Sequence, residues 1–194
     1  MRIVGILLAA GSGRRFDASG ARNKLLAPLA DGQPVVAAAA RVMLGALPHV
    51  IAVVHDGDSE LAALLGAMGC DIAPCPDAGL GMAASLVHGL RHAAPTADGW
   101  VVALGDMPYV QTATITALCS AIEQGAAIAA PFLDGRRGNP VAFDRTHLDE
   151  LLALRGDSGA RLLLQAHPVR EVGVDDPGIV PDIDTPADLT RFAP

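Results

Sequence analysis

Two aspartates occupy loop positions from which their carboxylates can bind a hard divalent cation. Asp106 follows the apolar run of residues 99–104, and Asp184 lies in the acidic segment 181–188 (PDIDTPAD). Thr185 is a good N-cap for the helix expected after it, so Asp184 is free for another role. Because Mg²⁺ takes oxygen ligands and often only one or two protein carboxylates besides phosphates, the pair predicts a Mg²⁺ site. Each aspartate taken alone also fits an ordinary acidic turn.

A glycine-rich, basic loop follows the first apolar run of the chain. Residues 8–16 read LAAGSGRRF, and Lys24 comes shortly afterwards. Small residues let backbone N–H groups approach a phosphate closely, and Arg14, Arg15 and Lys24 supply positive charge for a triphosphate. The loop matches neither the P-loop pattern nor the dinucleotide pattern GxGxxG. It therefore predicts another kind of phosphate-binding loop, although GSG alone also fits a plain turn.

Three further polar loops are candidate binding segments. Residues 77–85 (DAGLGMAAS) lead a glycine-rich loop into a helix, where backbone groups and the Ser85 hydroxyl can read the edge of a base. Residues 134–143 (DGRRGNPVAF) and 156–161 (GDSGAR) can bind an acceptor phosphate or a polar ring. A loop–helix junction, a hairpin turn and a helix start would account for the same residues without a ligand.

Apolar runs of strand length alternate with helical patterns along the chain. Strands are expected at residues 2–9, 49–55, 71–74, 99–104, 126–130, 141–143 and 169–174, and helices at 35–46, 60–68, 82–94, 112–124, 144–154, 159–166 and 185–192. Runs that are apolar throughout indicate an α/β sheet, mainly parallel, that helices cover. Ligands of such sheets bind beyond the carboxyl ends of the strands, which is where the glycine-rich loop and Asp106 are expected.

Length and composition suit one domain over residues 1–194. The 51% hydrophobic content excludes wholesale disorder, and no apolar run approaches the roughly 20 residues of a membrane helix. Residues 1–10 fit a buried strand better than a signal peptide. The net charge of −7, without a basic stripe, disfavours nucleic-acid binding. The three cysteines indicate free thiols in a reducing cytoplasm, and the six histidines show no HExxH-like spacing.

Taken in order, these motifs resemble those of the MobA-like nucleotidyltransferase family, and within it the molybdenum cofactor cytidylyltransferases. LAAGSGRRF with Lys24 is similar to the family's nucleotide loop, GLGMAASLVHGL to its base-side loop and helix, and LGDMP to its metal-aspartate segment. RGNPVAF, GDSGAR and DIDTPADL are similar to later segments, so the resemblance covers nearly the whole chain. It implies a Rossmann-like three-layer sandwich of the nucleotide-diphospho-sugar transferase type, with a mainly parallel, partly mixed central sheet.

The resemblance also implies roles for single residues. The nucleotide would contact Leu8, Ala9, Ala10, Gly11, Ser12, Gly13, Arg15, Lys24, Gly79, Gly81, Ser85 and Asp106. Arg15, Lys24 and Asp106 would be catalytic, Asp106 and Asp184 would bind Mg²⁺, and the GMxxS pattern resembles members that prefer CTP. The acceptor would contact Asn139, Pro140, Asp157, Gly159 and Arg161.

The implied activity is Mg²⁺-dependent transfer of CMP from CTP to molybdopterin or its molybdenum-loaded form, with release of pyrophosphate. A client molybdoenzyme or an insertion chaperone would be a further partner. Two alternatives stay open: transfer to another phosphorylated acceptor, such as a sugar or polyol phosphate, and a non-catalytic escort of a pterin cofactor. Retention of Lys24, Asp106 and Asp184 together speaks against the escort.

One segment departs from the family pattern. Residues 16–24 (FDASGARNK) form a longer loop than usual, with Asp17 where glycine is typical. The sequence therefore leaves the position of Lys24 open, and Arg22 is a second candidate for its role.

Overall fold

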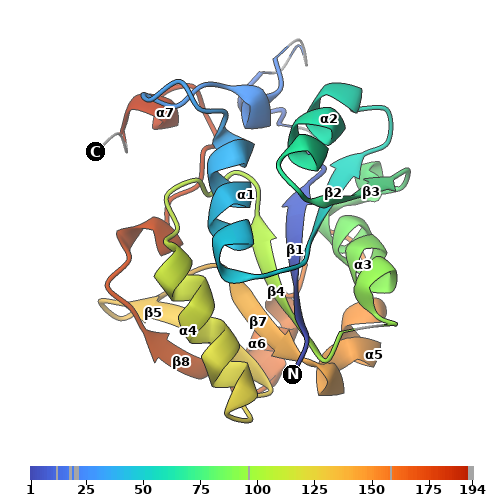
Figure 1. Cartoon of the computed structure of the whole chain (residues 1–194), viewed down its shortest axis with the longest axis vertical. Coiled ribbons are helices and arrows are strands. Elements are labelled where there is room, and N and C mark those ends of the chain that lie inside the picture. Colours follow the sequence, from blue (N-terminus) through green and yellow to red (C-terminus); the bar gives the residue numbers. More distant parts are fainter. Residues whose placement is uncertain (12, 18, 20–21, 96, 158, 192–194) are drawn as a thin grey trace.

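One sheet of eight strands forms the centre of the structure, a computed structural model that describes the chain except residues 12, 18, 20–21, 96, 158 and 192–194 (Figure 1). The strands are β1 (Ile3–Ala9), β2 (Val50–His55), β3 (Asp71–Cys75), β4 (Gly99–Leu104), β5 (Ile128–Leu133), β6 (Arg136–Arg137), β7 (Val141–Asp144) and β8 (Arg170–Gly173). Their order is β3-β2-β1-β4-β7-β5-β6, and β8 pairs with β5. β1 to β4 pair in parallel, whereas β7 runs antiparallel to β4 and β5. The expected mainly parallel, partly mixed sheet is confirmed.

Helices cover both faces of the sheet (Figure 1). They are α1 (Val35–Ala46), α2 (Ser59–Ala67), α3 (Met82–Ala93), α4 (Thr112–Glu123), α5 (Leu148–Leu152), α6 (Arg161–Ala166) and α7 (Asp188–Arg191), with short 3-10 turns η1 (Lys24–Leu26), η2 (Ala78–Leu80), η3 (Arg145–His147) and η4 (Pro177–Ile179). None of the helices in the described part of the chain is long and apolar enough to cross a bilayer.

The two faces of β1 enter two separate hydrophobic clusters. Ile3 and Leu7 pack with α1, α2 and α4, whereas Val4 and Ile6 pack with α3, α5 and α6. Successive side chains of a strand point to opposite faces, so a strand between two helical layers must be apolar at every position. This requirement explains the unbroken apolar run that begins the chain.

Residues 144–154, expected as one helix, form two shorter elements instead. Asp144 stays in β7, and its carboxylate accepts a hydrogen bond from the Thr146 backbone N–H at 2.9 Å. The chain then forms η3, which begins after this cap and leads directly into α5. Helical structure ends at Leu152 rather than at residue 154.

Two later helices begin after their expected starts. α6 begins at Arg161 rather than at residue 159, because Gly159 has a φ of +50° and cannot belong to a right-handed helix. α7 begins at Asp188 rather than at Thr185, and the Asp188 carboxylate accepts hydrogen bonds from the Thr185 backbone N–H and hydroxyl. The last residue of the expected helix, 192, lies outside the described residues.

The segment after β8 is held in place by Asp176, which is 1% exposed. Its carboxylate accepts hydrogen bonds from the backbone N–H of Gln111 (2.8 Å) and the hydroxyl of Thr114 (2.6 Å) at the start of α4, and from the N–H of Gly178 (2.9 Å). The Ile183 N–H then donates to the carbonyl oxygen of Asp106 at 2.8 Å. These contacts carry the chain from the far edge of the sheet back to the end of β4.

Asp176→Ala is therefore expected to lower the free energy of unfolding by about 3 kcal/mol, since hydrogen bonds to charged groups contribute about 1.5–3 kcal/mol each and buried donors are left unpaired. Denaturant unfolding of the two proteins measures the difference. Asp175→Ala is the matched control, because this neighbouring side chain is exposed. Equal losses in the two variants would contradict the assignment.

Candidate active site

A cleft of about 660 Å³ opens where β1 and β4 end. The two strands pair in parallel with Leu8 opposite Leu104, so the loops that follow them start side by side. The cleft is lined by Leu8, Ala10, Gly11, Gly13, Arg14, Arg15, Lys24, Leu25, His55, Ala78, Gly79, Gly81, Met82, Ser85, Leu104, Asp106, Asp157 and Asp184. Its volume lies within the range of small-molecule sites, which runs from about 300 to 1,000 Å³.

Lys24 lies between the two aspartates singled out in the sequence. Its Nζ is 2.7 Å from Asp106 Oδ2 and 3.3 Å from Asp184 Oδ1, and the whole residue is only 8% exposed. Lys24 begins η1, which Asn23 caps by accepting a hydrogen bond from the Leu25 N–H. A buried lysine paired with two carboxylates is typical of a site that binds charged ligands.

The longer loop before Lys24 is organised by Asp17. Its carboxylate accepts hydrogen bonds from Ser19, at both the hydroxyl and the N–H, and from the Arg22 N–H. The Ser19 hydroxyl is the main cause of a lowered pKa of Asp17. The Arg22 guanidinium faces Asp17, with Nε 3.9 Å from Oδ2, and its Cζ lies 5.8 Å from the centroid of the Phe16 ring. In the described structure it is therefore Lys24, not Arg22, that contacts the two cleft aspartates.

The acidic cluster has a donor set that fits a divalent cation. Carboxylate oxygens of Asp106, Asp182 and Asp184 lie within 4.8 Å of one another. Among the described residues no hydrogen-bond partner exists for Asp106 Oδ1, although this oxygen is buried. An unpaired buried carboxylate oxygen is costly, and a metal ion would satisfy it.

Asp182 is a candidate ligand that sequence reasoning missed. Partial desolvation, followed by the negative charges of Asp184 and Asp106, raises the pKa of its carboxyl group. The spacing of Asp182 and Asp184 was a usable signal, because alternate residues of an extended segment project to the same side.

Arg15 forms a second contact with Asp184, 2.5 Å from Nη1 to Oδ2. Its side chain is 78% exposed, so water screens this pair far more than the Lys24 pairs. Because the exposed pair contributes little free energy, the Arg15 side chain can exchange Asp184 for a bound anion.

The loop before α3 forms another part of the cleft wall. Gly79 and Gly81 line it together with Ser85, which is buried and shares a hydrogen bond with the Cys75 thiol. Burial raises the pKa of Cys75, so the thiol stays protonated. The loop thus offers backbone groups and one anchored hydroxyl to a ligand.

Gly81 joins this loop to the segment that carries Asp157. A Cβ at Gly81, where φ is +111°, would lie 2.3 Å from Asp157 Oδ1 and 2.8 Å from the Gly156 carbonyl group. The Ala83 N–H also donates to the Gly156 carbonyl oxygen at 3.0 Å. Residues 79–81 and 156–157, remote in sequence, therefore form one wall.

Gly81→Ala is expected to destabilise the fold by about 1–3 kcal/mol, the usual cost of a strained backbone conformation, and to weaken nucleotide binding. Thermal melting and calorimetric titration with nucleotide measure the two effects. Gly125→Ala is the matched control, since Gly125 also has a positive φ, +92°, but a Cβ there meets none of the described atoms within 4 Å and the residue lies outside the cleft lining. A Gly81→Ala protein that binds nucleotide as tightly as Gly125→Ala would contradict the shared wall.

Several residues predicted from the sequence lie away from the cleft lining. Ala9 is a buried strand residue, and Asn139 and Pro140 line a small apolar cavity with Leu104 and Met107. Gly159 and Arg161 also lie outside the lining, and Ser12 lies outside the described residues. The lining also contains Leu25, His55 and Leu104, to which sequence reasoning assigned no role, and Ala78 and Met82 from the candidate segment 77–85.

The MobA-like NTP transferase domain matches residues 5–172, a span that contains the glycine-rich loop, Lys24 and Asp106. The chain belongs to this family. The purine catabolism protein PucB of Bacillus subtilis is 31% identical over 98% of this chain and 97% of its own length.

Two solved structures extend the likeness over the whole fold. Rv0371c from Mycobacterium tuberculosis has a TM-score of 0.85 at 34% identity, covering 100% of this chain and 97% of its own, and it has also been solved in complex with manganese. A nucleotidyl transferase from Methanothermobacter thermautotrophicus has a TM-score of 0.82 at 26% identity, covering 99% and 96% of the two chains. The nucleotide-diphospho-sugar transferase fold implied by the motifs is thereby confirmed.

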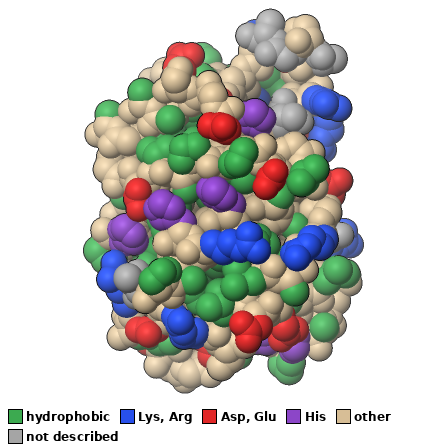
Figure 2. Space-filling model, turned by 90° about the vertical axis from the view of Figure 1, so that its right-hand side faces the viewer, with side chains coloured by type: hydrophobic (Ala, Val, Ile, Leu, Met, Phe, Trp, Pro, Cys, Tyr) green, Lys and Arg blue, Asp and Glu red, His purple; other side chains and the backbone are tan. Residues whose placement is uncertain are grey.

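The surface of this MobA-like chain carries charge of mixed sign on the side that holds α2, α3 and α5. Figure 2 shows Lys and Arg side chains there among acidic, histidine and apolar ones. The strongest local concentration of opposite charges described above is instead inside the cleft, at Lys24, Asp106 and Asp184.

Proposed function

We propose that this MobA-like chain transfers CMP from CTP to a molybdopterin-type cofactor, using a divalent cation, Mg²⁺, and releasing pyrophosphate. The observation that supports it most is the cluster of Lys24, Asp106 and Asp184 beside the glycine-rich loop, in a cleft with room for a nucleotide and an acceptor. A protein that only escorts a cofactor has no need of this cluster.

The proposed reaction is a direct displacement. A phosphate oxygen of the acceptor attacks the α-phosphorus of CTP, a new P–O bond forms, and the bond from the α-phosphorus to the bridging oxygen of pyrophosphate breaks. The attacking phosphate is already anionic, so no general base is required, and positioning and charge stabilisation carry the catalysis.

Asp106, Asp182 and Asp184 would hold the cation, which supplies Lewis-acid stabilisation of phosphate charge when bound. Lys24 would exchange its carboxylate partners for triphosphate oxygens as the cation binds. Arg15 would follow, because among the described residues its exposed side chain is held by one ion pair, which water screens. Backbone N–H groups around Gly11 and Gly13 would cradle the phosphates.

The base would lie against the wall formed by Gly79, Gly81 and Ser85. The hydroxyl of Ser85 is anchored by Cys75, so it presents a fixed polar group to the base edge. The acceptor would enter beside Asp157, with Asn139, Pro140, Gly159 and Arg161 contributing once it is bound.

The test is pyrophosphate release with Mg²⁺ or Mn²⁺ when CTP, GTP, ATP and UTP are offered separately with molybdopterin. Release with CTP alone is the expected result. Release with GTP would keep the mechanism and overturn the base assignment, and release only with a sugar or polyol phosphate would overturn the acceptor. Tight nucleotide binding without release for any acceptor would favour an escort protein.

A further inference from the structure

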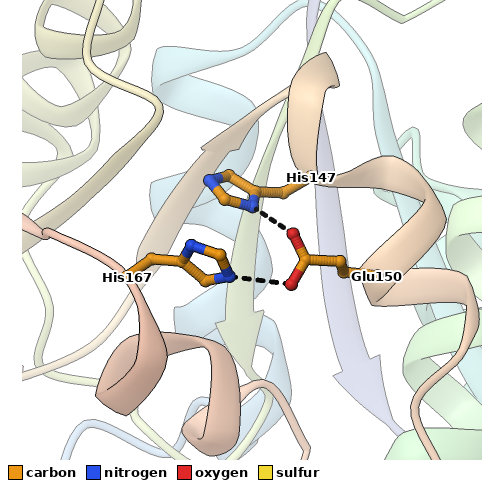
Figure 3. Close-up of side chains that lie close together, drawn as sticks. All are labelled: His147, Glu150 and His167. Carbon is orange, nitrogen blue, oxygen red and sulfur yellow. Dashed lines mark hydrogen bonds and ion pairs between the residues drawn. The ribbon is translucent and has the colours of Figure 1, made fainter.

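A second group of metal-ligating side chains lies in the layer of α5 and α6, outside the cleft. His147 Nδ1 is 3.2 Å from Glu150 Oε1, and His167 Nε2 is 2.7 Å from Glu150 Oε2 (Figure 3). The two imidazole rings meet edge to face with centroids 4.5 Å apart. One ligand atom from each of the three residues lies within 4.8 Å of the other two.

The three side chains come from two anchored segments, one that carries His147 and Glu150 and one that carries His167. His147 ends η3, and its side chain is only 10% exposed. Glu150 lies in the first turn of α5, one residue before the fully buried Leu151. His167 follows the last residue of α6, and its N–H donates to the carbonyl oxygen of Leu163 at 3.0 Å. The ligand atoms are therefore brought together by packed backbone rather than by mobile side chains.

The site lies at the end of the sheet opposite the cleft. β7 runs antiparallel to β4 with Asp144 beside Gly99, so η3 follows at the amino end of β4, whereas Asp106 follows its carboxyl end. The six residues of β4 separate the two places by roughly 20 Å, at about 3.3 Å per residue.

We propose that His147, Glu150 and His167 form a second metal site that binds one Zn²⁺ ion. Two imidazole nitrogens and a carboxylate oxygen are a common three-ligand set for zinc, with water in the fourth position. Two ligand atoms about 2.0–2.1 Å from a tetrahedral ion lie about 3.3 Å apart. His147 Nδ1 is 3.2 Å from Glu150 Oε1 and His167 Nε2 is 2.7 Å from Oε2, so the carboxylate would have to turn until one oxygen faces both nitrogens, which already lie within 4.8 Å of each other. Glu150, half exposed, provides the side open to water.

On binding, each histidine would coordinate as a neutral imidazole. The ring nitrogen that faces Glu150 would pass any proton it carries to water and donate its lone pair to the ion, and the other ring nitrogen would carry the remaining N–H. The ion would connect the start of α5 to the end of α6, two short helices joined by residues 153–160. Its role would be structural, because neither histidine lines the cleft.

The test is Zn²⁺ titration by equilibrium dialysis in an Asp106→Asn/Asp184→Asn background, which disables the cleft carboxylates. One bound equivalent is expected, and Glu150→Gln and His167→Asn should each weaken binding at least tenfold, the lower end of effects seen even for groups that only support a ligand. His92→Asn is the matched control, since His92 is an exposed histidine paired with a single carboxylate, Asp71, at 3.1 Å. No bound zinc, or equal binding by all three variants, would overturn the proposal.

A second readout needs no substitution at the site. Adding Zn²⁺ to the background protein should shift the imidazole NMR signals of His147 and His167 and leave those of His92 in place. Unchanged signals for the first pair would show that the cluster is only a hydrogen-bonded contact between α5 and α6. Loss of pyrophosphate release has no bearing on this result, so the two proposals fail separately.

Discussion

Asp106→Asn is expected to lower kcat for pyrophosphate release by about 10²–10³-fold, equivalent to about 3–4 kcal/mol of transition-state stabilisation. Asp106 carries the one carboxylate oxygen of the cluster that is buried without a hydrogen-bond partner among the described residues. Replacing it with an amide removes the charge that would hold the cation and keeps the side-chain shape. Steady-state assays with saturating Mg²⁺ measure the effect.

The fold should tolerate this change. Lys24 keeps Asp184 as an ionic partner, and the Asp106 backbone carbonyl, which accepts from the Ile183 N–H, is unaltered. Asp98→Asn is a suitable control, because Asp98 is an exposed aspartate at the other end of β4. A folded Asp106→Asn enzyme with the turnover of Asp98→Asn would remove Asp106 from the mechanism.

Lys24→Met is expected to have two effects of opposite sign. Turnover should fall by 10²-fold or more, because the cation that stabilises the triphosphate charge is lost. Affinity for Mn²⁺ should rise on the order of tenfold, because the ammonium group no longer competes for the two carboxylates. Kinetic assays and calorimetric Mn²⁺ titration measure the two quantities separately.

The same variant makes a prediction about stability. Without metal, Asp106 and Asp184 would face each other without the cation that now separates them, so the melting temperature in chelator should drop and Mn²⁺ should restore it. Arg22→Met is the matched control, since it removes a cation from the same loop that contacts Asp17 instead. Equal melting temperatures of the two variants in chelator and with Mn²⁺ would contradict the role of Lys24 as the counter-ion of Asp106 and Asp184.

Strongly patterned segments could be read from the sequence with little error. The helix at residues 35–46 and the strand at 99–104 have the expected bounds, because hydrophobic periodicity is decided by neighbours along the chain. The expectation was less accurate where local hydrogen bonds compete with a helical pattern. Asp144 caps a 3-10 turn, and Gly159 adopts a left-handed conformation, and each choice shortens a helix.

The residue types of the candidate site could also be found in the sequence, together with the family. The glycine-rich loop, Lys24, Asp106 and Asp184 all reach the cleft. Their order along the chain carried the resemblance to MobA-like enzymes, and the match over residues 5–172 confirmed it. Sequence alone left open whether Lys24 or Arg22 contacts the aspartates.

Only the tertiary structure decided which charges meet. Lys24 lies 82 residues from Asp106 and 160 residues from Asp184, and their contact depends on the parallel pairing of β1 with β4 and on the return of the C-terminal segment past Asp176. The same holds for His167, which reaches Glu150 across 17 residues. Local propensity acts over a few residues, whereas these contacts depend on the packing of two helical layers against one sheet. The sequence by itself therefore determined which chemical groups are available, and the tertiary structure determined which of them are in contact.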